Sequence, residues 1–193
     1  MMANNKIKYF ILTGDPGVGK TTLTKKLCVA IQQLGVQASG FYTEEVRKEK
    51  VRMGFDVVSL EGERGRLARD QSLLTDPVKH NVGKYGVLVP EFESIALYCL
   101  RKQSALPSLL VIDEIGKMEF FSTPFKTMVK EIFSPGSDRF VLATIPSRKG
   151  DPLIEDIRSN KRGKVWVVTR ENRNHIHENI LNEMKIALAI AKT

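Results

Sequence analysis

One octapeptide constrains this chain more than any other feature of its sequence. The residues Gly14-Asp15-Pro16-Gly17-Val18-Gly19-Lys20-Thr21 fit the pattern G-x-x-x-x-G-K-[ST], which forms a phosphate-binding loop between a strand and a helix. A random chain of this length would contain the pattern with a probability on the order of 0.01, at an average glycine frequency of about 7%. The context also fits, because the apolar run Tyr9–Thr13 precedes the motif and a helical pattern follows Lys20.

The residue types of this loop indicate its chemistry. The glycines let successive N–H groups turn inward around a polyphosphate, and the start of the following helix adds unpaired donors and a favourable dipole. Lys20 can reach the β- and γ-phosphates, and the Thr21 hydroxyl can ligate Mg²⁺. We expect the nucleotide to contact Gly14, Asp15, Pro16, Gly17, Val18, Gly19, Lys20, Thr21 and Thr22. The alternative is a glycine-rich turn with an incidental lysine.

A phosphate-binding loop of this kind is usually accompanied by an aspartate at the end of a buried strand. The run Leu109-Leu110-Val111-Ile112-Asp113 matches this Walker B pattern, with Asp113 holding Mg²⁺ directly or through water. The run is weak evidence alone and strong evidence together with the loop. The next residue, Glu114, can orient and deprotonate a water in line with the γ-phosphorus. We therefore expect Glu114 to act as general base alongside Lys20, with a structural hydrogen-bonding role as the alternative.

Strand-like and helix-like segments alternate along the chain, which predicts an α/β fold with a mostly parallel sheet covered on both faces. Continuous apolar runs predict buried strands at Tyr9–Thr13, Leu109–Asp113, Phe140–Ile145 and Val165–Thr169. Helical patterns run from Lys20 to Gly35, from about Phe92 to Leu100, from Pro124 to Ile132 and from Ile176 to Ala191. The length of 193 residues suggests one domain over residues 1–193.

Residues 40–90 have a different pattern. Gly40–Arg47 and Gly54–Leu60 look like paired strands joined by the charged turn Lys48-Glu49-Lys50, and a Gly/Arg-rich loop follows at Glu61–Arg66. Tyr85–Val89 is expected to be one more strand. We predict a small β-hairpin insertion or sheet extension on the main domain.

Composition limits the location and the partners of the protein. The net charge of +8 comes from 30 Lys and Arg against 22 Asp and Glu, and these residues are interspersed, which favours a solubility role over nucleic-acid binding. Nucleic acid remains a possible partner that the function does not require. No apolar run reaches the roughly 18 residues that span a bilayer, and Met1–Asp15 lacks a signal-peptide core. Two cysteines cannot form a disulfide framework, so we expect a monomer in the cytoplasm, with the nucleus as the alternative.

Several further residues have both a functional and a structural interpretation. Thr144 is either a γ-phosphate sensor or an ordinary strand-end threonine. Lys117 and Glu119 either shape the site or form a structural salt bridge. The candidates for an arginine finger, each of which is otherwise a solvated side chain, are Arg47, Arg64, Arg66 and Arg69.

Asn172 and Arg173 precede the last helix, where Arg173 could stack on the nucleobase. The alternative is helix capping by Asn172 or Asn174. The three histidines, His80, His175 and His177, lack the companions that a zinc site needs.

Five segments together resemble a known family. They are Gly14–Thr22, Gly40–Arg47, Gly54–Val58, Val111–Glu119 and Glu171–Asn174, in that order, and the stretch Asp113-Glu114-Ile115-Gly116-Lys117-Met118-Glu119 is the most specific. The chain resembles the cancer-related nucleoside-triphosphatases of animals and their thermophilic bacterial and archaeal relatives over nearly its whole length. The resemblance implies a three-layer, RecA-like P-loop NTPase fold with an additional strand between the two Walker strands. It also implies that Gly14–Thr21 and Leu109, Leu110, Val111, Ile112, Asp113, Glu114, Ile115 and Gly116 line the nucleotide site.

The resemblance further implies slow hydrolysis of ATP, GTP, CTP and other nucleoside triphosphates to the diphosphate and phosphate. Few base-reading side chains are evident, so we expect broad base tolerance with Mg²⁺ as cofactor. Two alternatives stay open: a nucleoside or nucleotide kinase, which shares the loop, and a nucleotide-switched RNA-binding module.

Overall fold

The computed structural model describes residues 6–101 and 108–190, and within these ranges nine strands form one sheet with the order β5-β6-β4-β3-β2-β7-β8-β1-β9. The strands are β1 (Tyr9–Gly14), β2 (Gln37–Lys48), β3 (Val51–Ser59), β4 (Arg64–Asp70), β5 (His80–Val82), β6 (Tyr85–Val87), β7 (Ser108–Asp113), β8 (Phe140–Pro146) and β9 (Gly163–Val167). The helices are α1 (Lys20–Gln33), α2 (Val89–Arg101), α3 (Thr123–Ile132), α4 (Pro152–Arg158) and α5 (Ile176–Ala187), with 3-10 turns η1 (Gln71–Leu73) and η2 (Glu119–Phe121). None of these helices is long and apolar enough to cross a bilayer.

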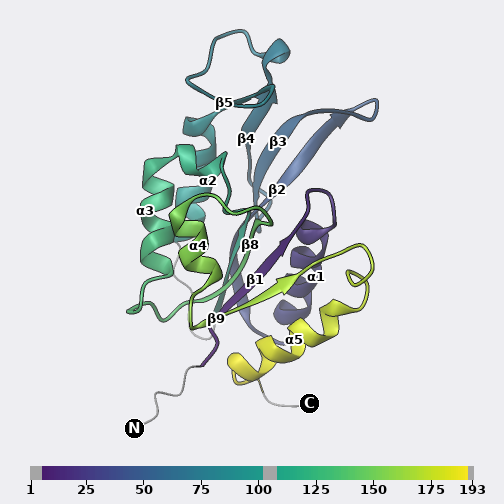
Figure 1. Ribbon diagram of the computed structural model, residues 1–193, viewed down its shortest axis with the longest axis vertical. Coiled ribbons are helices and arrows are strands. Elements are labelled where there is room, and N and C mark those ends of the chain that lie inside the picture. The colour runs from purple at the N-terminus through teal and green to yellow at the C-terminus, as the bar shows by residue number, and fades with distance from the viewer. Residues whose placement is uncertain (1–5, 102–107, 191–193) are drawn as a thin grey trace.

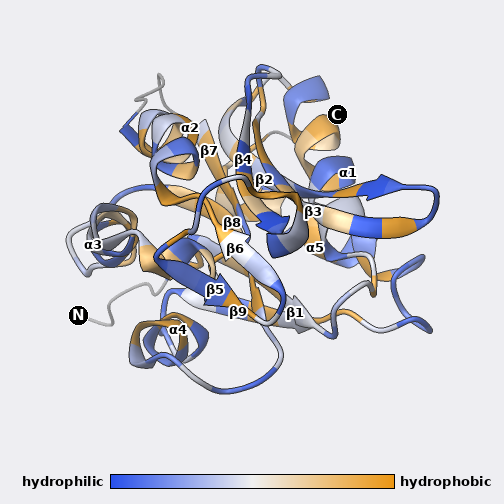
Figure 2. Ribbon diagram, turned by 90° about the horizontal axis from the view of Figure 1, so that it is seen from above, coloured by the Kyte–Doolittle hydropathy of each residue, from blue (hydrophilic) through white to orange (hydrophobic). Residues whose placement is uncertain are grey.

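Helices cover both faces of the parallel part of the sheet (Figure 1). Alternate residues of β1 explain the arrangement, because Tyr9 and Ile11 belong to the core shared with α2, α3 and α4, whereas Phe10 and Leu12 belong to the core shared with α1 and α5. Burial on both faces therefore requires the continuous apolar runs seen in the sequence. Figure 2 shows the same division, with apolar colour on the strands and polar colour along the outer sides of the helices. The three-layer α/β prediction is confirmed.

The order of the strands places three loops at one edge of the sheet. β8 lies between β1 and β7 and is parallel to both, as the family resemblance implies for the additional strand. Gly14 at the end of β1 pairs with Pro146 at the end of β8, and Asp113 ends β7 opposite Tyr42 of β2. The segments that follow β1, β7 and β8 consequently leave the sheet side by side at its carboxyl edge.

Residues 40–90 extend the sheet, as expected. β2 pairs with β7 up to Tyr42, and from Phe41 to Lys48 it forms an antiparallel hairpin with β3. The hairpin turn has positive φ at Glu49 (49°) and Lys50 (67°). The loop expected over Glu61–Arg66 is wrong at its end, because Arg64 already begins β4. The loop was expected because the segment is rich in glycine and arginine. In the structure the arginines of β4 are exposed or half-buried and form ion pairs with carboxylates of neighbouring elements.

Most helix and strand limits differ from the expected ones by a few residues. The strand expected to reach Val89 ends at Val87, since α2 begins at Val89, and β9 lies two residues before its expected position. α3 begins as expected near Pro124, with the Ser122 hydroxyl accepting a bond from the Phe125 N–H as N-cap. α5 ends at Ala187, short of the predicted face, and Ala191 lies outside the described residues.

Helix α4 was not predicted from the sequence, because it spans only seven residues. Asp151 caps it by accepting a bond from the Leu153 N–H. Its last residue, Arg158, donates to the Thr13 hydroxyl at 3.3 Å and to the Pro146 carbonyl at 2.6 Å. One guanidinium group therefore joins this helix to the carboxyl ends of β1 and β8.

Candidate active site

The phosphate-binding motif lies where the sequence predicted it, between the end of β1 and the start of α1. Gly14 must be glycine, because a Cβ at this position would lie 2.3 Å from the Val168 carbonyl oxygen and φ is +152°. Gly19, with φ of +108°, immediately precedes the helix. The loop therefore presents the unpaired N–H groups of a helix start to the sheet edge, which is the geometry that anions prefer.

Lys20 is held inside this loop. Its Nζ donates to the Gly14 carbonyl at 2.8 Å and to the Asp15 carbonyl at 3.2 Å, and the residue is only 8% exposed. Within the described ranges it forms no ion pair. A buried ammonium group satisfied by carbonyls alone is available to a phosphate, because anionic oxygens are stronger acceptors than carbonyls.

Asp113 ends β7 with its carboxyl group completely enclosed. Its Oδ1 accepts a hydrogen bond from the Thr144 hydroxyl, whereas its Oδ2 is buried without a partner. Burial raises the pKa of Asp113, while Thr144, Thr21 and Lys20 act in the opposite direction. An unpartnered buried carboxylate oxygen is costly unless a ligand satisfies it.

These residues fit a magnesium ion. The Asp113 carboxyl group, whose Oδ2 has no partner, interacts with the Thr21 side chain, which lowers the Asp113 pKa. Both side chains offer hard oxygen ligands. In the part of the chain that the structure describes, no group of three or more His, Cys, Asp or Glu could hold a metal. Protein-bound Mg²⁺ commonly uses one or two protein oxygens and takes its other ligands from phosphate and water, so two residues suffice.

The apolar residues before Asp113 pack in the two hydrophobic cores. Leu110 and Ile112 pack in one core and Leu109 and Val111 in the other. All four side chains are nearly or fully buried in these cores. The expectation that these residues line the nucleotide site stays a prediction. Their role is to hold the strand that carries Asp113. Ile115 is likewise buried, and its N–H donates to the Thr144 carbonyl at 2.9 Å.

Two glutamates lie on either side of Gly116. A Cβ added to Gly116 would lie 2.9 Å from Oε1 of Glu114 and 2.9 Å from Oε2 of Glu119. Burial is the main cause that raises the pKa of Glu114, with a further increase from Asp113 and a decrease from Lys20. Burial and the neighbouring Glu114 raise the pKa of Glu119 to about 8. The site thus contains three carboxyl groups within seven residues of chain, those of Asp113 and Glu119 buried and that of Glu114 half-buried.

Glu119 is the site residue whose position the sequence could not settle. It is 5% exposed and makes no ion pair within the described chain, so the salt-bridge alternative is wrong for this residue. Lys117, by contrast, is exposed. Thr144 is fully buried and bonded to Asp113, so it is more than an ordinary strand-end threonine.

The four arginines considered as fingers are all engaged by acceptors on the sheet extension. Arg64 donates to Asp56 and Glu44, and Arg69 donates to Asp56. The other two pairs are Arg47 with Glu45 and Arg66 with Glu91. Their charges are therefore neutralised locally, and none contacts the phosphate-binding loop.

Arg173, which follows β9, contacts the phosphate-binding loop. Its Nη1 donates to the Val18 carbonyl at 3.4 Å, and its Cδ lies 3.7 Å from a Cβ built on Gly19. Asn172 does not cap α5, because the N-cap is His175 without a side-chain bond. Instead Asn172 stabilises the preceding turn by accepting from the Thr169 N–H and donating to the Val167 carbonyl.

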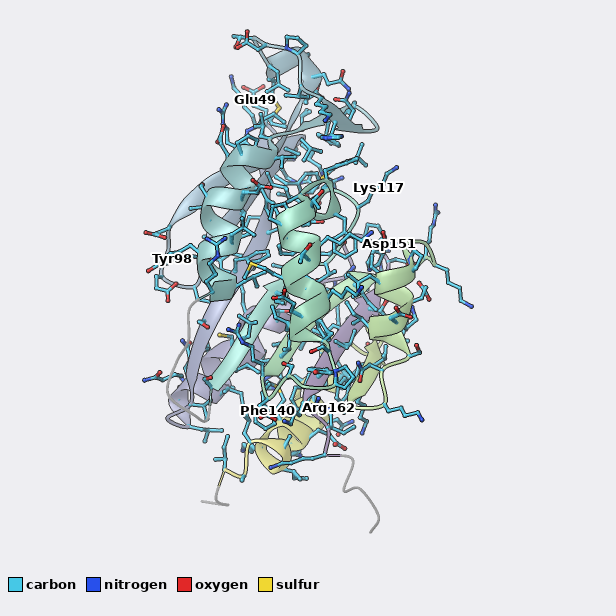
Figure 3. All side chains as sticks on the ribbon, turned by 90° about the vertical axis from the view of Figure 1, so that its left-hand side faces the viewer. Glu49, Tyr98, Lys117, Phe140, Asp151 and Arg162 are labelled. Atoms are coloured by element: carbon cyan, nitrogen blue, oxygen red, sulfur yellow. The ribbon has the colours of Figure 1, made fainter. Side chains whose placement is uncertain are left out.

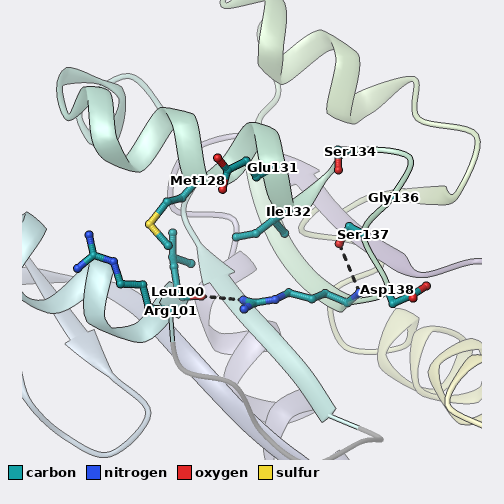
Figure 4. Close-up of a pocket in the computed structure, with 10 residues that line it drawn as sticks. Leu100, Arg101, Met128, Glu131, Ile132, Ser134, Gly136, Ser137 and Asp138 are labelled. Carbon is teal, nitrogen blue, oxygen red and sulfur yellow. Dashed lines mark hydrogen bonds between the residues drawn. The ribbon is translucent and has the colours of Figure 1, made fainter.

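A separate pocket of about 470 Å³ lies at the opposite edge of the sheet (Figure 4). It is enclosed by the ends of α2 and α3 and by the loop before β8, where Arg139 donates to the Leu100 carbonyl at 2.7 Å. Because it lies at the amino end of β8, it is remote from Asp113 and from the phosphate-binding loop.

A family model described as NTPase matches residues 9–181 of the chain. The chain belongs to this NTPase family. It is 48% identical over 183 residues to the cancer-related nucleoside-triphosphatase of Homo sapiens, covering 90% of this chain and 95% of that relative.

Two solved structures of similar proteins agree with the fold of this NTPase-family chain. The solution structure of a human cancer-related nucleoside triphosphatase has a TM-score of 0.76 and 46% identity, with 93% of this chain and 98% of that chain covered. The crystal structure of THEP1 from the hyperthermophile Aquifex aeolicus has a TM-score of 0.78 and 38% identity, with 90% and 97% covered. The resemblance seen in the sequence is confirmed.

Proposed function

We propose that the protein is a Mg²⁺-dependent nucleoside-triphosphatase that converts nucleoside triphosphates to the diphosphate and phosphate. The observation that carries the proposal is the buried Oδ2 of Asp113, which has no hydrogen-bond partner, with Glu114 next to it at the end of β7. Strand order brings both residues to the edge of the sheet that also holds the phosphate-binding loop. The names of the relatives support the same class of reaction.

The loop and α1 bind the polyphosphate in this proposal. Backbone N–H groups of residues 14–21 surround the phosphates, and Lys20 exchanges its carbonyl acceptors for phosphate oxygens. The Thr21 hydroxyl and Oδ2 of Asp113 would hold the magnesium ion. When bound, Mg²⁺ offsets negative charge on the β- and γ-phosphates.

Glu114 serves as general base. It accepts a proton from a water molecule as the water oxygen forms a bond to the γ-phosphorus, and the bond to the β–γ bridging oxygen breaks to release the diphosphate. The proton then leaves Glu114 with phosphate or solvent. Burial raises the pKa of the carboxylate, which makes it a stronger base than an exposed glutamate.

Arg173 places the nucleobase at the β9 side of the loop. Its guanidinium group is planar and can stack on any base, because every base has a π-face. Phosphate contacts likewise do not distinguish bases. We therefore propose similar turnover of ATP, GTP, CTP and UTP.

Phosphate release from the four triphosphates, with Mg²⁺ and with excess chelator, tests the proposal. We expect release from all four and loss of release with the chelator. A preference of about 10³-fold in kcat/KM for one triphosphate, equivalent to about 4 kcal/mol, would contradict base tolerance.

The two other functional classes predict different products. With γ-labelled ATP and a panel of nucleosides and nucleotides, a kinase labels the acceptor, whereas the proposed activity yields free labelled phosphate. An RNA-binding switch would show negligible turnover alone and RNA affinity that falls steeply with salt.

A further inference from the structure

The phosphate-binding loop is short of positive charge for the reaction proposed above. Lys20 is its one cation, and the arginines of the sheet extension are paired with carboxylates. In related phosphoryl-transfer enzymes, an arginine at the γ-phosphate contributes about 10³ to 10⁵ in rate. A cation for this position must therefore come from another segment of the chain.

The segment between β8 and α4 carries two adjacent cations beside the loop. Ser147 follows β8 directly, and its hydroxyl donates to Oδ1 of Asp15 at 3.1 Å. Arg148 and Lys149 come next, and both are exposed. Neither side chain has an acceptor or an aromatic partner among residues 6–101 and 108–190, in contrast to the arginines of β4.

The backbone of this segment is fixed at both ends while its two cations stay free. At one end Ser147 contacts the phosphate-binding loop. At the other end Asp151 caps α4 and forms an ion pair with Lys126 of α3 at 2.5 Å. The segment can thus present its side chains to a ligand without a large loss of backbone freedom.

Strand order decides which phosphate the segment faces. β1 has β9 on one side and β8 on the other, and β8 is followed by β7 with its catalytic-site acids. Arg173 follows β9, so it lies on the side proposed for the base. Arg148 and Lys149 follow β8, so they leave the sheet between the loop and Asp113, where the γ-phosphate is expected.

We propose that Arg148 and Lys149 bind the γ-phosphate oxygens and stabilise the charge that develops there during hydrolysis, as a cation pair supplied by the same chain. This inference rests on the proposed function and names the residues that complete it. Lys117 is a competing candidate, because it follows β7 and lies in the same middle part of the molecule as Asp151 in Figure 3, above Phe140 and Arg162.

The test compares the double variant Arg148→Gln/Lys149→Gln with the unmodified protein. We expect kcat to fall by about 10² or more, since the lost interaction is made mainly in the transition state. In calorimetry with Mg²⁺, affinity for a non-hydrolysable triphosphate analogue should fall by about tenfold, while affinity for the diphosphate changes less than about twofold. Because the two ligands differ only by the γ-phosphate group, the difference between their affinity changes reports the contribution of contacts to that group.

Lys130→Gln/Lys161→Gln is the matched control. It removes the same charge from two exposed lysines that have no ion-pair partner within residues 6–101 and 108–190, one near the end of α3 and one before β9. Equal loss of diphosphate and triphosphate affinity in the test variant, or unchanged kcat and triphosphate affinity, would overturn the proposal. So would Lys117→Gln reproducing the full selective loss while the double variant does not.

Failure of the proposed function gives a different result. If the unmodified protein releases no phosphate from any triphosphate, the hydrolysis proposal fails. The selective loss of triphosphate over diphosphate affinity would still identify Arg148 and Lys149 as γ-phosphate ligands.

Discussion

Carboxyl groups in two neighbouring parts of the sheet differ in their ion pairing and in the direction in which their pKa values are shifted. On the extension, Glu44 and Asp56 are bonded to arginines, and the pKa of Glu44 is lowered by Lys25 and Arg64. At the end of β7, burial raises the pKa of both Glu114 and Glu119, and neither forms an ion pair within the described residues. Acids of the first group have their charge compensated by arginines of the fold, whereas Glu114 and Glu119 have no such ion-pair partner among the described residues.

This contrast separates stabilising residues from reactive ones. Breaking a pair on the extension is expected to lower the free energy of unfolding and leave turnover per folded molecule intact. Replacing an acid at the end of β7 is expected to lower turnover and to raise the free energy of unfolding. The second effect is expected because a buried carboxyl group without an ion-pair partner opposes folding.

The largest expected effect belongs to Glu114→Gln. Loss of a general base should lower kcat by about 10² to 10⁴, while nucleotide affinity stays within a few-fold because the loop is unchanged. Single-turnover kinetics and calorimetry would measure the two quantities. Lys20→Ala is the comparison, since it should weaken both binding and turnover. Near-normal kcat in Glu114→Gln would assign the base to another residue.

Gly116→Ala should give the next largest effect. The added methyl group would lie 2.9 Å from carboxylate oxygens of Glu114 and Glu119, so both must move. We expect kcat to fall by about 10² with little change in KM, because misplacing a base by about 1 Å has this cost. Gly136→Ala is the control, as a Cβ there meets nothing within 4 Å. Equal kinetics for the two variants would contradict the packing described.

Asp56→Asn tests the other side of the comparison. The Asp56 side chain is 9% exposed and bonds both Arg64 and Arg69, so its loss should lower the free energy of unfolding by about 2–4 kcal/mol. Denaturant titration measures this, and phosphate release per folded molecule should be unchanged. The exposed pair Arg66–Glu91 provides the contrast, with less than about 1 kcal/mol expected for Glu91→Gln. Similar values for both variants would show that burial does not set the cost.

The smallest expected effect is a pH dependence of stability. Glu119 has a pKa of about 8 in the fold against 4.5 for the ordinary group, so between these values the folded state binds more protons than the unfolded state. The free energy of unfolding should therefore fall as pH rises, by at most about 1.4 kcal/mol per pH unit for this group. Denaturant titrations at pH 6 and pH 8, without nucleotide or Mg²⁺, would show a smaller fall in Glu119→Gln. An identical fall in both proteins would remove Glu119 as the cause.

Much of the site follows from sequence because its chemistry depends on local order. The loop, Asp113 and Glu114 are consecutive in short motifs, and apolar runs place them at strand ends. What sequence could not supply depends on partners distant in the chain. Arg64 was expected in a polar loop, but it begins β4, which pairs with β3, and its side chain bonds Asp56 and Glu44.

The environment of Glu119 and the packing of the residues before Asp113 also depend on tertiary structure and could not be predicted from local sequence. Lys117 and Glu119 are close in sequence, yet Lys117 is exposed in the turn before η2, whereas Glu119 is buried at the start of η2. The four apolar residues of β7 were assigned to the ligand with their neighbours, but alternation along a strand sends their side chains into the two cores.

A substitution at Arg158 is expected to affect the site although this residue is not one of the proposed catalytic or binding residues. Its guanidinium group bonds Thr13 and Pro146 at the ends of two central strands. A variant at this position would change how firmly the mouth of the loop is anchored. Screens that rank residues only by closeness to a ligand would therefore overlook it.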